Sequence, residues 1–388
     1  MTIDEASLRD RIGEIEDPLN GMDLASMGLV NDVTIEDGTA EVSLAFNSPY
    51  APAELELGDR IREVVEETGL EPDLVAQASL EHGFQEQIHP WVRNVIAVAS
   101  GKGGVGKTTV AANLAAGIED RGAMVGVLDA DIHGPNIPRI LPIEGEPGVT
   151  PDGELVPPRS DGVRVMSMRF MTEEEDDPAI LRGPMVNNVM HHFHEKVEWG
   201  VLDYLIVDLP PGTGDASLEL LQRTPIVGTV LVTTPQQMAL DDARKGLRMF
   251  EEHDAPILGI VENMSAFQCP SCGDAHEFFG SQAGLGAREI CEDYDVPFLG
   301  QLPLHPDIGA DGTEDPVVKD PDSPVQERFD ELVGDILDHV GRVNRRTVAE
   351  HVGELADADG TAGATPPEDT GETTESPEPD TAANTDLE

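Results

Sequence analysis

Two lysines stand five residues apart in a glycine-rich stretch, Val98 to Ala116, which reads VASGKGGVGKTTVAANLAA. Residues 101–108, GKGGVGKT, fit the pattern of Gly, any four residues, Gly, Lys and then Ser or Thr. A β-branched run precedes this pattern and a helix-forming run follows it, which is the context such a loop requires. Glycines let successive N–H groups point at phosphate oxygens, and the new helix adds its positive end. The pattern therefore predicts a phosphate-binding loop rather than a glycine-rich turn with a chance lysine.

Within this loop we expect Lys107 to bridge the β- and γ-phosphates and the Thr108 hydroxyl to bind Mg²⁺. The residues predicted to contact the nucleotide are Gly101, Lys102, Gly103, Gly104, Val105, Gly106, Lys107, Thr108 and Thr109.

The second loop lysine, Lys102, stands out because the only other lysines are Lys196, Lys245 and Lys319. The form KGGVGKTT resembles the deviant Walker A loop of the MinD, ParA and nitrogenase-iron-protein class. This resemblance implies that Lys102 reaches across a dimer interface to the partner's nucleotide. A cation supplied in this way would stabilise charge on the transferred phosphoryl group and tie hydrolysis to the dimer. A solvated loop lysine is the alternative.

Polar residues also directly follow three other apolar runs of the sequence. These residues are Asp129 with Asp131, Asp208 and Asn263, and the ends of such strands form the ligand-binding edge of an open α/β sheet. In the resembled class the segment with Asp129 and Asp131 is switch I, and the segment with Asp208 is Walker B. We therefore expect Asp208 to act on Mg²⁺ through its water shell, and Asp131, with Asp129 beside it, to orient the attacking water. Helix capping is the alternative for Asp129 and Asp131. The resemblance implies that the Asn263 amide hydrogen-bonds the adenine base of ATP. The alternative is that Asn263 hydrogen-bonds the local backbone in a turn.

Cysteines form a second pattern, QCPSCGDAH, which places Cys269 and Cys272 in a Cys-x-x-Cys turn. Thiolates at this spacing can converge on one soft metal, but a four-coordinate centre needs further ligands. Cys291 and His276 are nearby candidates for a zinc site. A second copy of the chain would instead supply the same pair, giving four thiolates on a two-fold axis.

Several motifs occur together in one order over about residues 93–340. They are KGGVGKTT, DADIHGPN, ILRGPM, VEWGVLDYLIVDLPPGTGD, VENMS, CPSCG and FLGQLPLHPDI. Together they resemble the Mrp/ApbC (NBP-type) family of ATP-dependent iron-sulfur cluster carriers. The resemblance implies a transferable [4Fe-4S] cluster held between two subunits by Cys269 and Cys272. Cys291 lies outside the motif and is expected to be a small buried residue.

The N-terminal segments DPLNGMDLASMGLV and SPYAPAELELGDRI resemble the small domain of iron-sulfur assembly factors. Relatives often carry a cysteine before the second proline, where this chain has Ala51. A thiol function is therefore not expected here, and docking or client recognition is the preferred role.

The elements that must position these residues follow from hydrophobic periodicity. Residues 7–80 predict helix, strand, strand, helix and strand, and from Arg93 short Val- and Ile-rich strands alternate with helices. The fold class is therefore α/β, a mainly parallel P-loop NTPase sheet preceded by a small α+β domain. We place the small domain at 1–82, a linker at 83–92 and the ATPase domain at 93–345. After an amphipathic helix over about 324–343, a disordered acidic tail is expected at 346–388.

Composition limits the partners and the compartment. The 388 residues carry 76 acidic and 24 basic side chains, a formal net charge of −52 that disfavours nucleic acid and anionic membranes. Acids interleaved with apolar positions are typical of a halophile's cytosolic surface. Three cysteines fit a reducing compartment. The N-terminus lacks a signal-peptide pattern, and no run approaches the about 18 apolar residues of a membrane span, so we expect a cytoplasmic protein.

The sequence thus predicts a homodimeric ATP hydrolase that transfers a labile [4Fe-4S] cluster. The implied cofactors are ATP and Mg²⁺, and the implied partners are apoprotein clients and an iron-sulfur assembly scaffold. Three alternatives remain: a MinD/ParA-type positioning ATPase without a cluster, a redox enzyme resembling the nitrogenase iron protein, and a zinc-stabilised ATPase.

Overall fold

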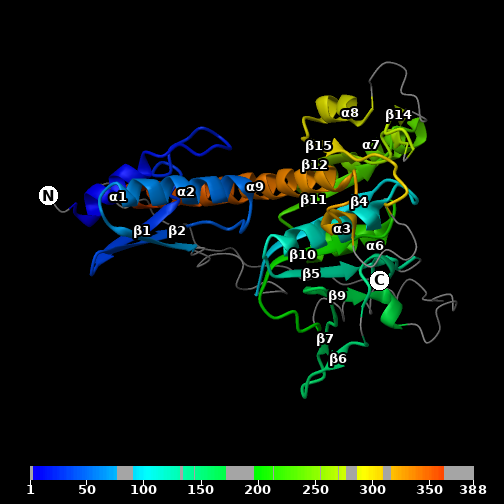
Figure 1. Cartoon of the computed structure of the whole chain (residues 1–388), viewed down its shortest axis with the longest axis horizontal. Helices are drawn as coiled ribbons and strands as arrows, with labels where there is room; N and C mark the ends of the chain where they lie inside the picture. The colour runs from blue at the N-terminus through cyan, green and yellow to red at the C-terminus, as the bar shows by residue number, and fades with distance from the viewer. Residues whose placement is uncertain are drawn as a thin grey trace, which may run out of the picture.

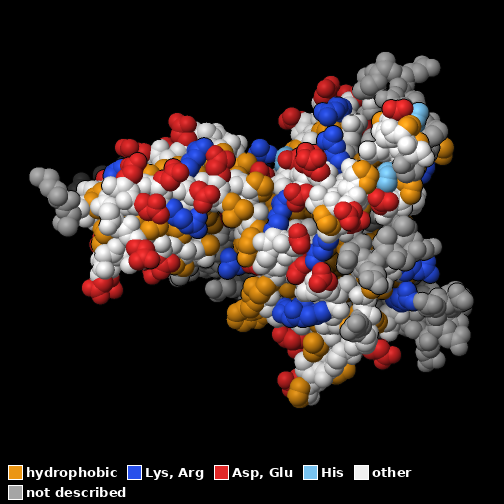
Figure 2. All heavy atoms as spheres, in the orientation of Figure 1, with side chains coloured by type: hydrophobic (Ala, Val, Ile, Leu, Met, Phe, Trp, Pro, Cys, Tyr) orange, Lys and Arg blue, Asp and Glu red, His pale blue; other side chains and the backbone are white. Residues whose placement is uncertain are grey.

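The computed structural model describes residues 3–76, 91–131, 134–143, 145–171, 196–212, 214–253, 255–269, 271–276, 286–308 and 316–361. Figure 1 shows two domains, with the small N-terminal one at the left of the view and the larger one at the right. On the face drawn in Figure 2, Asp and Glu side chains are scattered over both domains. Within the described ranges, no helix combines the length and apolar character needed to span a bilayer.

The N-terminal domain has the element order that the sequence predicts. Helix α1 (Glu5–Gly13) is followed by strands β1 (Val30–Glu36) and β2 (Thr39–Leu44), helix α2 (Pro52–Glu66) and strand β3 (Glu71–Ala76). Strand β2 lies in the middle of the sheet, antiparallel to β1 and parallel to β3. Apolar residues from the two helices and the sheet form a core that belongs to this domain.

The second domain is built on an eight-stranded sheet with the order β15-β12-β11-β4-β10-β5-β9-β8. Neighbouring strands run parallel except for β8, which is antiparallel to β9. This mainly parallel sheet confirms the predicted fold class. The strands are β4 (Val92–Ser100), β5 (Val125–Asp129), β8 (Arg159–Ser160), β9 (Val163–Ser167), β10 (Leu202–Asp208), β11 (Gly228–Thr233), β12 (Ile257–Glu262) and β15 (Phe298–Gln301).

Helices cover both faces of this sheet, so its strands are apolar on both sides. Along β4, Ile96 and Val98 pack with α3 and α9, whereas Val95 and Ala97 pack with α6, α7 and α8. The helices are α3 (Lys107–Asp120), α4 (Ile137–Ile140), α6 (Asp215–Arg223), α7 (Gln237–Glu252), α8 (Ala287–Tyr294) and α9 (Gln326–Thr361). The smaller elements are hairpins β6 (Gly148–Val149)–β7 (Leu155–Val156) and β13 (Phe267–Gln268)–β14 (Ala275–His276), and 3-10 turns η1 (Met168–Met171) and η2 (Val317–Lys319).

Helix α9 corrects the predicted C-terminal boundary. Its 36 residues continue to Thr361, so the prediction of disorder from 346 onward was wrong for residues 346–361. The helix runs from the ATPase domain alongside α2 of the N-terminal domain (Figure 1). There Arg345 is buried 3.2 Å from the Asp17 carboxylate, and Val348 packs on the N-terminal core. The helix continues past residue 345 because the other domain gives Arg345 and Val348 a surface on which to pack. Residues 362–388 of the expected tail lie outside the described residues.

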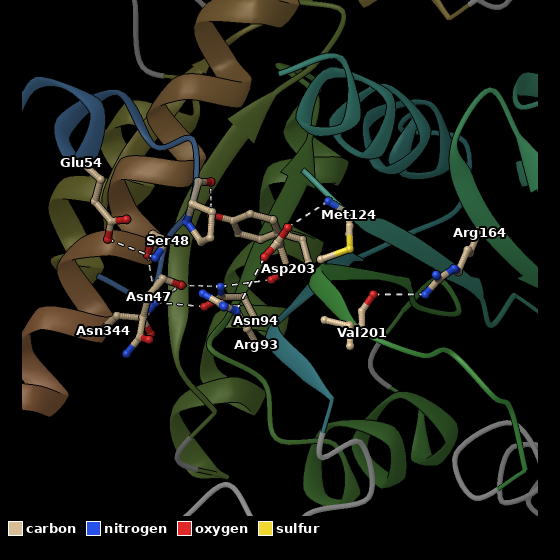
Figure 3. A network of polar contacts seen from close by, with 12 residues as sticks. Asn47, Ser48, Glu54, Arg93, Asn94, Met124, Arg164, Val201, Asp203 and Asn344 are labelled. Carbon is tan, nitrogen blue, oxygen red and sulfur yellow. Dashed lines mark hydrogen bonds and ion pairs between the residues drawn. The ribbon is translucent and has the colours of Figure 1, made fainter. Parts of the chain in front are cut away.

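Strand β4 begins at Val92, and residues 83–90 of the predicted linker lie outside the described residues, so the linker bounds stay a prediction. The two domains meet at the amino ends of the central strands, where amide groups join them (Figure 3). Asn94 of β4 donates from Nδ2 to the carbonyl oxygens of Asn47 at 2.7 Å and Asp203 at 3.2 Å. Asn344 of α9 donates to Oδ1 of Asn94 at 2.9 Å and to Oγ of Ser48 at 2.9 Å.

The segment that carries Ala51 is part of this junction. The Tyr204 hydroxyl donates to the Pro49 carbonyl at 2.8 Å, and the Ala53 N–H donates to Oδ1 of Asp338 at 2.9 Å. Ala51 itself is fully buried and packs into the ATPase core. This segment therefore packs against the ATPase domain of its own chain, and a role of the small domain in docking or client recognition stays a prediction.

Candidate nucleotide site and cysteine hairpin

The glycine-rich loop joins β4 to α3, and its shape depends on contacts that only glycine allows. Gly104 and Gly106 have φ angles of 80° and 87°, in the left-handed region. A Cβ on Gly106 would lie 2.1 Å from Nδ2 of Asn263, and one on Gly101 would lie 2.4 Å from the carbonyl carbon of Asp242. The loop is therefore packed closely against the end of β12 and the backbone of α7.

Three predicted residues meet at the start of α3. The Lys107 Nζ lies 2.5 Å from Oδ1 of Asp208, and the Thr108 hydroxyl donates to Oδ2 of the same carboxylate at 2.8 Å. Strand β10 pairs with β4, which brings Asp208 to the level of the loop. Burial raises the pKa of Asp208, while Lys107 and Thr108 oppose that rise. A hydroxyl and a carboxylate side by side form the hard oxygen set that Mg²⁺ prefers, so these residues fit the ion.

Asp129 is engaged with its own segment. Its Oδ2 accepts hydrogen bonds from the Ser167 hydroxyl at 2.9 Å and from the N–H of Ile137, the first residue of α4, at 3.2 Å. Asp129 therefore accepts the first N–H of α4, whose N-cap residue is Asn136, and its role beside the attacking water stays a prediction. Burial, and next the neighbouring Asp208 carboxylate, raise the pKa of Asp129 to about 7. Asp131 accepts from the Gly134 N–H at 3.2 Å, and its contact with the attacking water stays a prediction.

Lys102, which belongs to the loop, and Asn263, which contacts it, have different environments. Lys102 is half-buried and forms no hydrogen bond or ion pair with the part of the chain that the structure describes. Asn263 is buried, and its Nδ2 donates to the Val105 carbonyl at 2.8 Å while its Oδ1 accepts from the Met264 N–H at 2.9 Å. This is the backbone-bonding alternative for Asn263, whose adenine contact remains a prediction.

The two cysteines lie in the turn of the β13–β14 hairpin. The Cys269 N–H donates to the Asp274 carbonyl at 2.9 Å, and the Gly273 N–H donates to the Cys269 carbonyl at 2.8 Å. Cys272 is exposed and Cys269 is partly exposed. The N–H groups of Ser271 and Cys272 lower the pKa of Cys269 because they stabilise its thiolate. The turn thus presents two thiols to solvent, one of them biased toward the metal-binding form.

The other two zinc candidates do not join this pair. Cys291 is buried in α8, as the sequence predicts, and burial raises the pKa of its thiol to about 11. Among the described residues, no group of three or more Cys, His, Asp or Glu side chains is arranged to hold a metal. One described chain therefore offers two sulfur ligands and no complete zinc set.

Two supporting residues were not predicted from sequence. Ser167 holds Asp129, and Glu262 holds α8 by accepting the Ala287 N–H at 2.7 Å. Both are polar residues that end apolar strands, which is the signal that identified Asp208.

A mainly parallel sheet with a glycine loop between β4 and α3, and an aspartate at the end of the adjacent β10, defines a P-loop NTPase. The family described as NUBPL iron-transfer P-loop NTPase (ParA) matches residues 91–337, and the iron-sulfur cluster assembly protein family matches residues 5–79. The chain therefore belongs to the ParA/NUBPL family of iron-transfer P-loop NTPases, which confirms the resemblance found in its motifs.

The names of two relatives agree with this assignment. The iron-sulfur cluster carrier protein of Synechocystis is 40% identical over 321 residues, covering 80% of this chain and 90% of its own. The iron-sulfur cluster transfer protein NUBPL of Dictyostelium discoideum is 40% identical over 257 residues, covering 65% of this chain and 78% of its own. A nucleotide-binding protein of Archaeoglobus fulgidus in complex with ADP is 35% identical, covers 65% of this chain and 91% of its own, and superposes with a TM-score of 0.48.

Proposed function

We propose that the chain is a homodimeric, ATP-dependent carrier that holds a labile [4Fe-4S] cluster between its subunits and transfers it to apoproteins. The observation that carries this proposal is the Cys269–Cys272 turn, whose thiols are exposed to solvent and which follows by six residues the Asn263 that contacts the glycine loop. Two thiolates are half of the ligand set of a [4Fe-4S] cluster, and a second copy would supply the other half. A cluster held at an exposed interface is accessible to an acceptor protein.

ATP and Mg²⁺ would bind at the glycine loop. The loop N–H groups and Lys107 would hold the phosphates, and Thr108 with Asp208 would hold the ion and its water. Bound Mg²⁺ neutralises charge on the phosphates during transfer. Asp131 is proposed to orient water, and Lys102 to reach the nucleotide of the partner copy. Hydrolysis would then be slow in the monomer and linked to dimer geometry.

Anaerobic reconstitution with iron and sulfide tests the cluster site. We expect the wild-type chain to gain about four irons per dimer, an iron-dependent absorption and the mass of a dimer. The Cys269→Ser, Cys272→Ser double variant should lose all three. Cys291→Ser is the matched control, because it removes a buried thiol and should leave the cluster in place.

Three outcomes would overturn the cluster proposal. Absorption that persists in the double variant would place the cluster elsewhere, and a monomer that holds both iron and nucleotide would remove the shared site. Zinc without iron in protein purified anaerobically would favour the zinc-stabilised ATPase. Transfer from the loaded dimer to an apoprotein, with and without MgATP, then tests the link to the nucleotide.

The working environment is the last part of the proposal. We propose a cytoplasmic protein adapted to high salt, because a net charge of −52 is spread over both domains (Figure 2). Salt screens the repulsion between these carboxylates. The melting temperature should therefore rise as KCl is increased from about 0.1 M to about 2 M. A melting temperature that falls over this range would contradict the adaptation to salt.

A further inference from the structure

The nucleotide loop and the cysteine turn are connected by one short segment. Cys269 follows Asn263 by six residues, and Asn263 lies directly after β12. In Figure 1 the β14 hairpin lies near β12 and β15, at the side of the sheet where the chain leaves these strands. The contacts of residues 263–269 show how firmly this connection is held.

At its first residue, the segment contacts the loop directly. The Asn263 amide binds the Val105 carbonyl and the Met264 N–H, and its main-chain N–H donates to the Thr233 carbonyl at 2.8 Å. Gly106 lies so close to Nδ2 that even a Cβ would overlap it. Because the loop and the amide are in contact, a shift of the loop at residues 105–106 must move Asn263.

The next residue fixes the direction of the chain. Met264 has a φ angle of 56°, a left-handed conformation that non-glycine residues adopt only when their surroundings hold it. Its N–H is held by the Asn263 side chain, so the same amide sets both the loop contact and the turn. The Asn263 side chain therefore links two backbone segments that sequence distance separates.

Beyond the turn, the segment is tied to the chain that follows β15. Ser265 donates to the Leu302 carbonyl from both its N–H and its hydroxyl, each at 3.0 Å. The Leu304 N–H donates to the Ala266 carbonyl at 2.7 Å, and the Gln268 N–H donates to the Leu304 carbonyl at 3.0 Å. These hydrogen bonds restrain the backbone of residues 263–269, called the strip below, which ends at Cys269.

We infer that Asn263 is a positioning residue that couples the nucleotide loop to the Cys269–Cys272 turn, so that nucleotide binding changes the reactivity of the two thiols. The coupling needs no contact between nucleotide and hairpin, because the strip transmits a displacement from Val105. This inference rests on the proposed function, since it takes the hairpin as the site that holds the cluster.

Alkylation of the iron-free protein tests the coupling without a cluster. Cys269 and Cys272 are labelled with iodoacetamide, with and without saturating MgATP or MgADP, and the rates are read from peptides by mass spectrometry. Cys291 serves as the internal reference because it is buried. In the wild type we expect MgATP to change the rate at the two exposed thiols by about fivefold or more.

Two variants remove the coupling amide. Asn263→Ala deletes both hydrogen bonds, whereas Asn263→Asp keeps an acceptor for the Met264 N–H but loses the donor to the Val105 carbonyl. At nucleotide concentrations that saturate each variant, the ratio of rates with and without nucleotide should fall toward one in both. If neither variant folds, Met264→Gly is the substitute. It frees the backbone directly after Asn263 and should also reduce the ratio of rates.

Asn113→Ala is the matched control. Asn113 is also a buried asparagine near the loop, and it donates to the Thr109 carbonyl at 2.9 Å and accepts from the Val318 N–H at 3.1 Å. Its hydrogen bonds reach η2 and not the cysteine hairpin. If the loss of any buried amide near the loop were enough to lower the ratio, Asn113→Ala would lower it too. The nucleotide-dependent ratio in Asn113→Ala should equal that of the wild type.

The inference is overturned if the wild-type thiols do not respond to nucleotide, or if the Asn263 variants, or Met264→Gly in their place, retain the wild-type ratio. A chain whose thiols respond but which never holds iron would contradict the proposed function and leave the coupling standing. The two claims therefore fail separately.

Discussion

The central strands have polar groups at both ends, but the two ends are built differently. At the carboxyl ends, Lys107 and Asp208 are charged groups beside a glycine loop. At the amino ends, the Asn94 and Asn344 amides bind each other and the backbone of the N-terminal domain (Figure 3). Strand β4 belongs to both ends, because it starts beside the junction and runs into the loop.

This difference suggests separate roles for the two ends of the strands, in catalysis at the carboxyl ends and in joining the domains at the amino ends. The Lys107 ammonium can exchange Asp208 for an anionic ligand when one arrives, whereas neutral amides with satisfied hydrogen bonds make a rigid joint. The carboxyl ends should therefore govern turnover with little effect on folding. The amino ends should govern stability with little effect on turnover.

The largest expected effects lie in the loop. Lys107→Ala removes the cation on Asp208 and should abolish both tight nucleotide binding and hydrolysis. Lys102→Ala should reduce hydrolysis by about 100-fold or more and leave nucleotide binding to the single chain intact, because its charge acts on the partner's nucleotide. Phosphate release measured over a range of protein concentrations, with nucleotide titrations, distinguishes the two. Equal loss of binding in both variants would contradict a role across the interface.

Asn94→Ala tests the opposite end. It removes the Asn94 amide from the Asn47 and Asp203 carbonyls and takes one of its acceptors from Asn344, which keeps Ser48, so unfolding should cost about 1–3 kcal/mol less. Denaturant melts measure this change, and hydrolysis at saturating nucleotide should stay within about threefold of the wild type.

A control substitution sharpens that result. Asn31→Ala removes an amide whose bond to Ser43 is long, at 3.4 Å, and which lies within the N-terminal domain alone. Its loss of stability should be smaller than that of Asn94→Ala. A large loss of turnover in Asn94→Ala would show that the two ends of β4 are not independent.

The two ends of the central strands differ in how well the sequence predicts them. The reason is the sequence separation between the residues that interact at each end. The loop and the Cys-x-x-Cys turn are local patterns, and Asp208 is recognisable from the apolar run before it. The junction joins Asn94 to Asn47 and Asn344, which are 47 and 250 residues away, so no local pattern reveals it. The length of α9 was missed for the same reason, since Arg345 and Val348 of this helix pack on a domain at the other end of the chain.

The last predicted effect is a pH dependence at the junction, which appears only as the pH rises above about 4.5. Glu54 is buried and accepts the Ser48 N–H at 3.0 Å. Burial raises the pKa of Glu54 from 4.5 to about 7, against the opposing charges of Arg345 and Arg93. Between these values the folded chain keeps a proton that the unfolded chain releases, so the free energy of unfolding falls as pH rises from about 4.5 to about 7.

Glu54→Gln removes this dependence and keeps an oxygen for the Ser48 N–H. The variant should match the wild type near pH 4.5 and exceed its unfolding free energy by about 2–3 kcal/mol at pH 8. The raised pKa of Asp129 acts over the same window, but it is common to both proteins and cancels in their difference. Since Asp129 lies near the nucleotide loop and Glu54 does not, saturating MgADP should leave this difference unchanged. If this difference in unfolding free energy disappeared when MgADP bound, the titration of Glu54 would depend on the nucleotide site. The two ends of the sheet would then not be independent.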